Sequence, residues 1–395
     1  DRSPSRGLGD VYKRQIMKPV FFRITTVSLS LKTLLGGQLS FLNQYYNVTG
    51  IASGMGDELQ EVSLREGIRT IDVPMCRQIS LMSDFQSLIV IVFLFLKEKP
   101  YIVHANTPKA SLLSMIAAWI TRVPHRVYTV TGLRFETATG NLRRLLVIME
   151  KITCWCATKV IPEGEGVKRT LIREKITNKP LKVILHGNIS GIDVQHFNRT
   201  QHVELLASEI RKKGKFTFCF VGRIVKDKGI NELVLAFVRL TKVYPEVRLL
   251  LVGSFEADLD PVSSEIEHTI LNHSSISFLG FQQDIRPYLA ASDALAFPSY
   301  REGFPNVVLQ AGALGLPSIV TDINGCNEII EDGVNGVIIP PQDEEALYGA
   351  MKFFVEHRDT DVRAMAKKAR PIIVDRFEQH KVWEALLAEY QSLEK

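Results

Sequence analysis

Cysteine is scarce in this chain of 395 residues, which contains only five, and long hydrophobic runs are absent. The cysteines are scattered, and the close pair Cys154 and Cys156 has no second pair nearby, so the spacing predicts neither a disulfide scaffold nor a cysteine metal site. The longest apolar run, residues 88–96, is far shorter than a membrane-spanning helix, which needs about 20 residues. We therefore expect free thiols in a reducing compartment and a soluble or peripheral protein.

Several enzyme motifs are missing as well. No G-x-x-x-x-G-K-[ST] sequence is present, which argues against a P-loop kinase or ATPase, and no G-x-G-x-x-G sequence follows a predicted strand, which argues against a nicotinamide dehydrogenase. The chain also lacks H-E-x-x-H, G-x-S-x-G and clustered carboxylates of the kind that bind metals. We expect neither a metal site nor a nucleic-acid partner.

The composition is that of a folded protein, with 46% hydrophobic and 23% charged residues, and the length predicts two domains. Residues 1–16 lack apolar periodicity and are expected to be a non-native or disordered tail, so that the natural chain would begin near Met17. We assign residues 17–195 to a first domain, residues 196–378 to a second, and residues 379–395 to a C-terminal helix. That helix has an apolar face, which we expect to pack back on the first domain.

Short runs of β-forming residues alternate with helical patterns along both halves of the chain. This alternation predicts an α/β fold with two Rossmann-like, doubly wound domains that face a cleft. Residues 187–215 interrupt it and are predicted to be a linker followed by a polar surface segment. Ligands of such sheets bind at the carboxyl ends of the strands, so we expect the chemistry in the loops there. The predicted strands are residues 20–28, 46–52, 68–73, 101–105, 126–131, 159–162, 182–186, 216–222, 247–253, 277–280, 294–298, 318–322 and 336–340.

Charge is distributed unevenly over the two halves. Residues 16–195 contain 22 Lys and Arg against 13 Asp and Glu, whereas residues 196–395 contain 22 against 28. A basic half beside an acidic half indicates that the first half meets an anionic surface or ligand. The alternative interpretation is a set of solvated basic residues without a partner.

The sequence V-G-R-I-V-K-D-K-G, residues 221–229, joins a predicted strand to a predicted helix. Gly222 lets the backbone approach a ligand, and Arg223 and Lys228 place two cations ahead of a helix N-terminus. Such an arrangement is typical of a site for an anion of charge about −2. A solvated basic loop is the alternative.

A second loop follows the predicted strand at residues 294–298 and carries Glu302 at its tip. A carboxylate there is able to accept two hydrogen bonds from a sugar, and the free amides of the helix that begins near Pro305 are able to bind hydroxyls. Gln310 follows in that helix, where its amide is able to bridge a vicinal diol. In the alternative interpretation, Glu302 only stabilises the helix N-terminus.

The pattern V-G-R-x-x-x-x-K-G followed by E-G-F-P-N-V-x-L-x-A-x-A-x-G-x-P strongly resembles the retaining glycosyltransferases of family four, which have the GT-B fold. The resemblance spans about residues 17–390. It implies that the second domain binds a nucleotide-diphosphate sugar, UDP- or GDP-linked, and that the first domain receives the acceptor. The roles that it implies are diphosphate binding for Gly222, Arg223 and Lys228, catalysis for Glu302, donor-sugar binding for Gly303, Phe304, Asn306 and Val307, and ribose binding for Gln310.

Two positions depart from the family pattern. The family has E-x7-E, and the second glutamate is Gln310 here, which loses a charge-assisted hydrogen bond but keeps an acceptor. The family also has T-V-H-G in the first domain, and its histidine is Thr131 here.

Three further first-domain residues are candidates for the cleft. The pair Gly36-Gly37 partly matches a glycine loop that the family has near the donor phosphates, although a simple turn is the alternative. His104 ends a predicted strand and is a candidate for the cleft, although a lone histidine at the end of a strand is more often structural.

The resemblance implies transfer of a sugar to a saccharide or lipid-linked saccharide acceptor with retention of anomeric configuration, in capsule, O-antigen or exopolysaccharide synthesis. The departing phosphate would take the acceptor proton, and no metal would be needed. The basic first half and the apolar run of residues 88–96 favour an acceptor carried on a membrane lipid, and thus a cytoplasmic protein that lies peripherally on an anionic membrane surface, at the inner face of the plasma membrane. For the apolar run taken alone, packing in the protein core is the favoured interpretation. The alternatives are a nucleotide-sugar-binding protein with weak or no turnover, which Gln310 and Thr131 would favour, and a sugar epimerase or phosphorylase on the same fold.

Overall fold

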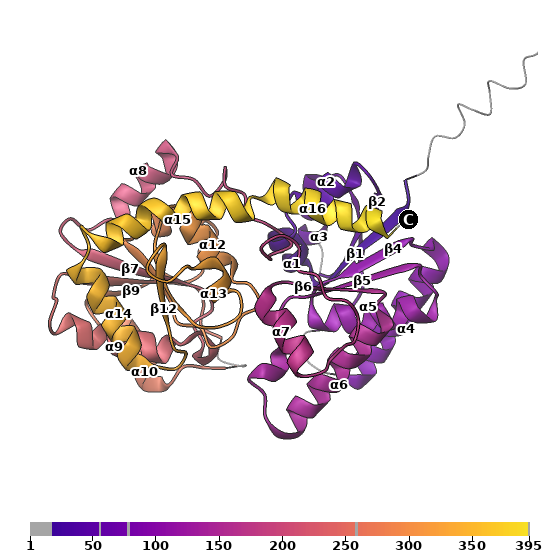
Figure 1. Cartoon of the computed structure of the whole chain (residues 1–395), viewed down its shortest axis with the longest axis horizontal. Coiled ribbons are helices and arrows are strands. Elements are labelled where there is room, and N and C mark those ends of the chain that lie inside the picture. Colours follow the sequence, from indigo (N-terminus) through magenta and orange to yellow (C-terminus); the bar gives the residue numbers. More distant parts are fainter. Residues whose placement is uncertain (1–17, 55–56, 77–79, 257–259, 394–395) are drawn as a thin grey trace, which may run out of the picture.

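Two parallel six-stranded sheets form the frame of the computed structural model, which describes residues 18–54, 57–76, 80–256 and 260–393 (Figure 1). The predicted tail, residues 1–16, lies outside the described residues. The first sheet has the order β3-β2-β1-β4-β5-β6. Its strands are β1 (Val20–Val27), β2 (Asn47–Ser53), β3 (Arg69–Asp72), β4 (Ile102–Ala105), β5 (His125–Val130) and β6 (Lys159–Pro162).

Helices cover both faces of this first sheet, which is why six consecutive residues of β1 are buried. One face packs on α4 (Leu81–Glu98), α5 (Pro108–Ile120) and α6 (Gly140–Cys156), below the sheet in Figure 1. The other face packs on α1 (Ser28–Leu34), α2 (Gln38–Asn43) and α3 (Asp57–Glu66). Helix α7 (Glu165–Arg173) follows β6.

The second sheet has the order β12-β11-β10-β7-β8-β9. Its strands are β7 (Phe216–Val221), β8 (Val247–Val252), β9 (Ile276–Phe278), β10 (Ala294–Phe297), β11 (Ser318–Thr321) and β12 (Gly336–Ile339). Its helices are α9 (Ile230–Thr241), α10 (Ser264–Asn272), α11 (Arg286–Ala290), α12 (Asn306–Ala313), α13 (Cys326–Ile329) and α14 (Glu344–Glu356).

The predicted fold class is confirmed. In both sheets the direction of winding reverses beside the first strand, between β1 and β4 and between β7 and β10. The loops after these neighbouring strands diverge to opposite faces and leave a crevice at their carboxyl ends, where ligands of doubly wound sheets bind.

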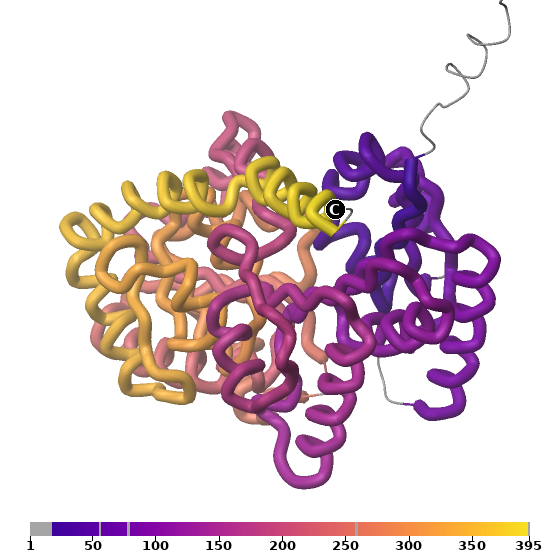
Figure 2. The backbone as a smooth tube through the Cα atoms, turned by 45° about the vertical axis from the view of Figure 1, so that its right-hand side comes forward, coloured from indigo at the N-terminus to yellow at the C-terminus, as the bar shows by residue number. Residues whose placement is uncertain are grey.

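The last two helices join the domains. Helix α15 (Asp361–Phe377) packs on the second domain, and α16 (Gln379–Ser392) returns to the first (Figure 2). There Leu386 and Tyr390 enter the core on the face of the sheet that α1–α3 cover. At the crossing, the amide of Ile192 donates to the carbonyl of Phe377 (2.8 Å), and the amide of Gln379 donates back to Ile192 (3.1 Å).

The strand predicted in the middle of the chain is wrong. Residues 182–186 form no strand, because only Leu181 makes an isolated bridge, to Val160, before left-handed φ angles at Leu185 (49°) and Asn188 (52°) turn the chain away from the sheet.

Within residues 187–215, predicted to be a linker followed by a polar surface segment, lies the unpredicted surface helix α8 (Gln201–Ile210). Thr200 caps it by accepting a hydrogen bond from the amide of Val203, and Val203 and Ala207 pack on Ala290 of α11. This stripe of two small apolar residues is too narrow to stand out in a polar sequence.

Candidate active site

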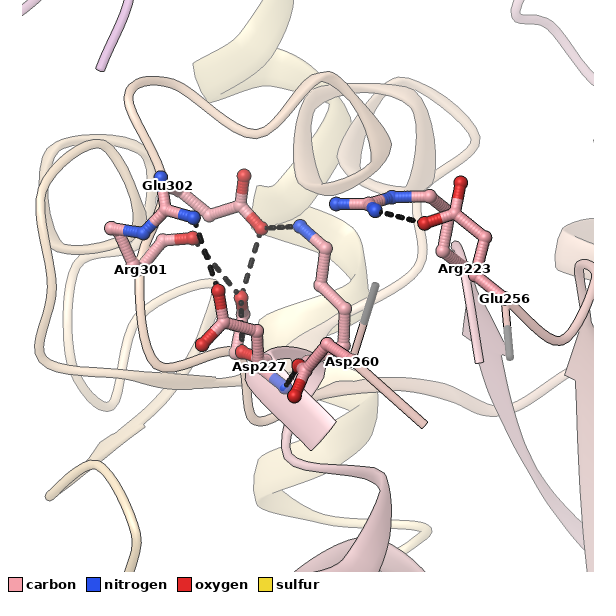
Figure 3. A network of polar contacts seen from close by, with 8 residues as sticks. Arg223, Asp227, Glu256, Asp260, Arg301 and Glu302 are labelled. Atoms are coloured by element: carbon pink, nitrogen blue, oxygen red, sulfur yellow. Dashed lines mark hydrogen bonds and ion pairs between the residues drawn. The ribbon is translucent and has the colours of Figure 1, made fainter. Parts of the chain in front are cut away.

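The two sequence motifs meet in one cluster at the crevice between β7 and β10. Lys228, in the short helix η2 (Lys226–Lys228) after β7, forms an ion pair with Glu302, in the loop after β10, although 74 residues separate them (Figure 3). The same carboxylate oxygen accepts a hydrogen bond from Ser299 Oγ (2.9 Å). Both charged side chains are only 16% exposed, so the pair is well shielded from water.

A glycine brings the two loops this close. Gly229 has a left-handed φ of 69°, and a Cβ atom there would lie 2.0 Å from the carbonyl oxygen of Pro298. Any side chain at residue 229 would therefore push the loop after β7 away from the loop that carries Glu302.

Arg223 lies next to this pair and is bound to a different carboxylate. Its guanidinium is 2.5 Å from Glu256, in the loop after β8, and its side chain is half exposed (Figure 3). Asp227 holds the loop in place: its carboxylate accepts from Arg301 (3.0 Å) and its amide donates to Asp260 (2.6 Å). Both predicted diphosphate-binding cations are thus paired with glutamates.

The first domain touches this cluster through its backbone. A Cβ atom on Gly303 would lie 1.6 Å from the carbonyl oxygen of Thr131, so only glycine permits the contact. Thr131 itself follows β5, and its hydroxyl donates to the carbonyl of Asn106 (2.7 Å). The residue that replaces the family's histidine therefore lies directly beside the loop of Glu302.

The predicted sugar-binding residues surround the start of α12. The ring of Phe304 packs on Phe377, with 5.5 Å between centroids, and Val307 packs on the core of the second domain. The Asn306 side-chain oxygen accepts from Asn188 of the linker (2.7 Å). Gln310 is partly exposed one turn further along the helix. The contact of Phe304, Asn306 and Val307 with a donor sugar, and that of Gln310 with the ribose, stay predictions.

One predicted cleft residue belongs to the core instead. His104 is fully buried, and its two ring nitrogens lie 2.5 Å from the hydroxyl of Tyr390 and 2.8 Å from that of Thr129. Burial and the nearby guanidinium of Arg23 lower its pKa well below the usual range, so the ring is neutral. His104 joins α16 to the first sheet, so it is a structural histidine and its candidate role in the cleft is wrong.

The pair Gly36-Gly37 forms the turn between α1 and α2. Gly37 has a φ of 77°, and a Cβ atom there would lie 2.8 Å from the ring of Trp383 in α16. Its amide donates to a carboxylate oxygen of Glu66 (3.0 Å). The turn lies against α16, and its contact with donor phosphates stays a prediction.

Sequence reasoning missed two glutamates between the domains. Glu163 directly follows β6, and burial, together with the nearby carboxylates of Glu302 and Glu328, raises its pKa well above the usual range. Glu328 lies in helix α13 of the second domain, and its carboxylate accepts hydrogen bonds from the amides of Glu165 (2.6 Å) and Gly166 (3.0 Å) at the start of α7. A carboxylate at the end of a parallel strand was the available signal for Glu163.

The arrangement defines a class of protein. Two facing Rossmann-like domains place a cation–carboxylate cluster, at the crevice of one, against a backbone loop of the other. This is the GT-B architecture of nucleotide-sugar-dependent glycosyltransferases.

Comparison with known proteins identifies the family. Residues 204–371 match the model of glycosyl transferases group 1, and residues 43–187 match the glycosyl transferase 4-like domain. The chain is 32% identical over 378 residues to the capsular polysaccharide biosynthesis glycosyltransferase CapM of Staphylococcus aureus, covering 95% of this chain and 97% of CapM. The chain belongs to this family, the retaining glycosyltransferases of family four.

Two further likenesses agree with this membership. Over 322 residues the chain is 30% identical to an Escherichia coli protein named UDP-Gal:alpha-D-GlcNAc-diphosphoundecaprenol alpha-1,3-galactosyltransferase, covering 80% of this chain and 81% of that protein. The structure of Anabaena Alr3699/HepE in complex with UDP and glucose has a TM-score of 0.79 at 20% identity, covering 95% of this chain and all of that one. The latter likeness shows the shared fold.

Proposed function

We propose that this glycosyltransferase transfers a sugar from a UDP-sugar to a lipid-linked saccharide during the synthesis of a bacterial surface polysaccharide. The observation that carries the proposal is the cluster of Lys228, Glu302 and Ser299 against the backbone of Thr131. The names of the S. aureus and E. coli relatives support the pathway, the uridine base and the lipid-linked acceptor.

Donor binding exchanges ionic partners. In the structure Arg223 is paired with Glu256 and Lys228 with Glu302. The diphosphate of the donor carries about two negative charges and replaces both glutamates, because its oxygens make charge-assisted contacts with both cations at once. Lys228 thereby releases Glu302, whose carboxylate turns to the hydroxyls of the donor sugar.

Transfer breaks the bond between the anomeric carbon and the phosphate oxygen. Arg223 and Lys228 stabilise the negative charge that develops on the leaving diphosphate, and they are already in place when the donor binds. The acceptor hydroxyl forms the new bond from the face that the diphosphate leaves, so the anomeric configuration is retained. Its proton goes to the departing phosphate oxygen. We propose that this chemistry needs no metal ion.

The basic first domain is the part that meets the membrane. Among the residues that the structure describes, none of the helices is both long and apolar enough to cross a bilayer. The excess of Lys and Arg in residues 16–195 supports peripheral attachment to an anionic surface, and we place the enzyme at the inner face of the plasma membrane.

The test is a transfer assay with defined donors. Purified protein is incubated with one donor, UDP-galactose, UDP-glucose, UDP-N-acetylglucosamine or GDP-mannose. The acceptor is N-acetylglucosamine linked to a lipid through a diphosphate, and the products are analysed by mass spectrometry and NMR. We expect one UDP-sugar to yield a lipid-linked disaccharide with an α linkage. An inverted linkage, a free epimerised sugar, or tight UDP binding without any transfer would contradict the proposal.

A further inference from the structure

Helix α4 is apolar, yet most of it faces solvent. Only Ser87, Ile91 and Phe95 are buried in the first domain. The exposed side chains include Phe85, which is 60% exposed, and Phe93, which is 68% exposed. The large exposed hydrophobic residues of α4 are Leu81, Met82, Phe85, Ile89, Val90, Phe93 and Leu96.

Helices α5 and α6 continue this apolar surface. They pack beside α4 on the same face of the first sheet, with α5 in contact with both neighbours. Trp119 of α5 and Trp155 of α6 are 47% and 63% exposed, and their rings contact each other with 5.1 Å between centroids. We call the surface formed by the exposed residues of the three helices the α4–α6 face; α5 and α6 contribute Trp119, Ile120, Leu142, Leu145, Ile148, Ile152 and Trp155. Exposed apolar surfaces of this extent mark interaction sites.

The charges around the α4–α6 face are complementary to an anionic bilayer. Three carboxylates near the face are neutralised by ion pairs, Asp84 with Lys109, Glu98 with Arg69 and Glu174 with Arg143. Five further basic residues on the same helices and the adjoining turns form no ion pair among the described residues; they are Lys97, Arg122, Arg144, Lys151 and Lys175. Apolar side chains, a tryptophan pair and unpaired cations are the features of an interfacial membrane surface.

A groove lies directly behind α6, at the crevice between β1 and β4. It has a volume of about 280 Å³, and Leu146 and Met149 of α6 form its apolar wall. Thus one side of α6 lines the groove while the other belongs to the α4–α6 face. Gly132, which also lines the groove, contacts the backbone of Gly303 in the donor loop. Arg134 lines the groove as well and forms no ion pair among the described residues. The Glu150 carboxylate on the groove wall accepts a hydrogen bond from Tyr128, and burial raises its pKa to about 7.

We propose that the α4–α6 face docks on an anionic bilayer and that the groove behind α6 binds the diphosphate head of an acceptor anchored in that bilayer. This inference rests on the proposed function and adds the docking surface and the acceptor site. The lipid chain stays on the apolar side of α6, Arg134 contacts the diphosphate, and the saccharide reaches past Gly132 to Glu302. The bilayer is favoured over a second copy of this chain because a self-complementary interface would bring the unpaired cations against one another.

The docking surface is tested by flotation with vesicles of equal parts phosphatidylglycerol and phosphatidylethanolamine. We expect the wild type to float at low salt and the double variant F93S/W155S to bind at least about tenfold less, because two membrane-facing aromatic rings are lost. The matched control L64S/L205S removes two apolar residues that are 77% and 61% exposed on other faces, and it should float like the wild type. Both variants should melt near the wild type, because all four side chains are exposed.

Three outcomes would overturn the docking surface. The first is that the wild type fails to float with anionic vesicles. The second is that the control variant loses flotation as completely as F93S/W155S. The third is that light scattering finds a dimer that F93S/W155S converts to monomers. In the last case a second copy covers the face. None of these outcomes depends on glycosyl transfer, so an enzyme with no activity on any donor would refute the proposed function and leave the docking surface standing.

The groove is tested with geranyl diphosphate, titrated calorimetrically into protein that is saturated with UDP so that the donor site is filled. We expect R134A to weaken binding about tenfold, because a charge-assisted contact is lost, while the UDP-induced thermal shift stays unchanged. The control R169A removes an exposed cation of α7 and should have no effect. Equal binding to R134A, or inorganic pyrophosphate binding as tightly as geranyl diphosphate, would overturn the acceptor site.

Discussion

Replacing Glu256 with glutamine tests the exchange of ionic partners on which donor binding depends. In the free protein this carboxylate holds Arg223 at 2.5 Å, and the two side chains are 30% and 50% exposed. Exposed ion pairs of this kind contribute about 0.2–1 kcal/mol, which a diphosphate must offset before it takes Arg223. The variant E256Q should therefore bind UDP about 1.4- to 5-fold more tightly, since the competing charge is gone.

Isothermal calorimetry with UDP at low ionic strength measures this change directly. The control E267Q removes an exposed carboxylate from the first turn of α10 in the same domain and should leave the dissociation constant unchanged. The gain should shrink as salt is added, because salt screens the exposed pair. Weaker binding by E256Q would refute the reasoning, because it would show that Glu256 contacts the nucleotide instead of competing with it.

Further predictions concern the domain contact, the helix α12 and the groove. G303A should fold but lose transfer activity at least about 100-fold, because its Cβ would lie 1.6 Å from the carbonyl of Thr131; the control G349A, where a Cβ meets nothing within 4 Å, should keep full activity. Q310E should lower the KM for the donor several-fold, because a charge-assisted hydrogen bond to the ribose is about twice as strong as a neutral one; an unchanged KM would remove residue 310 from the ribose site. Burial raises the pKa of Glu150 from 4.5 to about 7. Between pH 4.5 and 7 the folded protein therefore keeps a proton that the unfolded chain loses, and the free energy of unfolding falls as the pH rises through this range. E150Q should abolish that fall and be more stable than the wild type at pH 8 by at most about 3 kcal/mol in urea unfolding; equal pH profiles would contradict the assignment.

Features that are local in sequence were predictable. The strand-to-helix loops at residues 221–229 and 298–310 follow from glycine, cation and proline positions within about a dozen residues, and the structure joins both loops at one crevice. The α/β alternation likewise fixed the two sheets, because parallel strands buried on both faces have a distinctive pattern.

Features that depend on contacts between distant parts of the chain were not predictable. His104 ends a strand like a cleft residue, but α16 crosses from the second domain and buries it against Tyr390, 286 residues away. Glu163 and Glu328 gain their roles only when the domains face each other. For residues 88–96 the sequence left packing in the core and contact with a membrane as alternatives, since an apolar run has the same signature in both, and the structure exposes four of these side chains, Ile89, Val90, Phe93 and Leu96.

The most direct test of the account is thermal unfolding of the protein with UDP, GDP, ADP or CMP at millimolar concentration and without added metal. A nucleotide at 100 times its dissociation constant stabilises the folded state by about 2.7 kcal/mol, which a melting shift reveals. We predict a shift with UDP that R223A and K228A each abolish, while the control K367A, an exposed lysine of α15, retains it. No shift with any nucleotide, or a UDP shift that survives in both variants, would contradict the assignment of the diphosphate site to the crevice between β7 and β10.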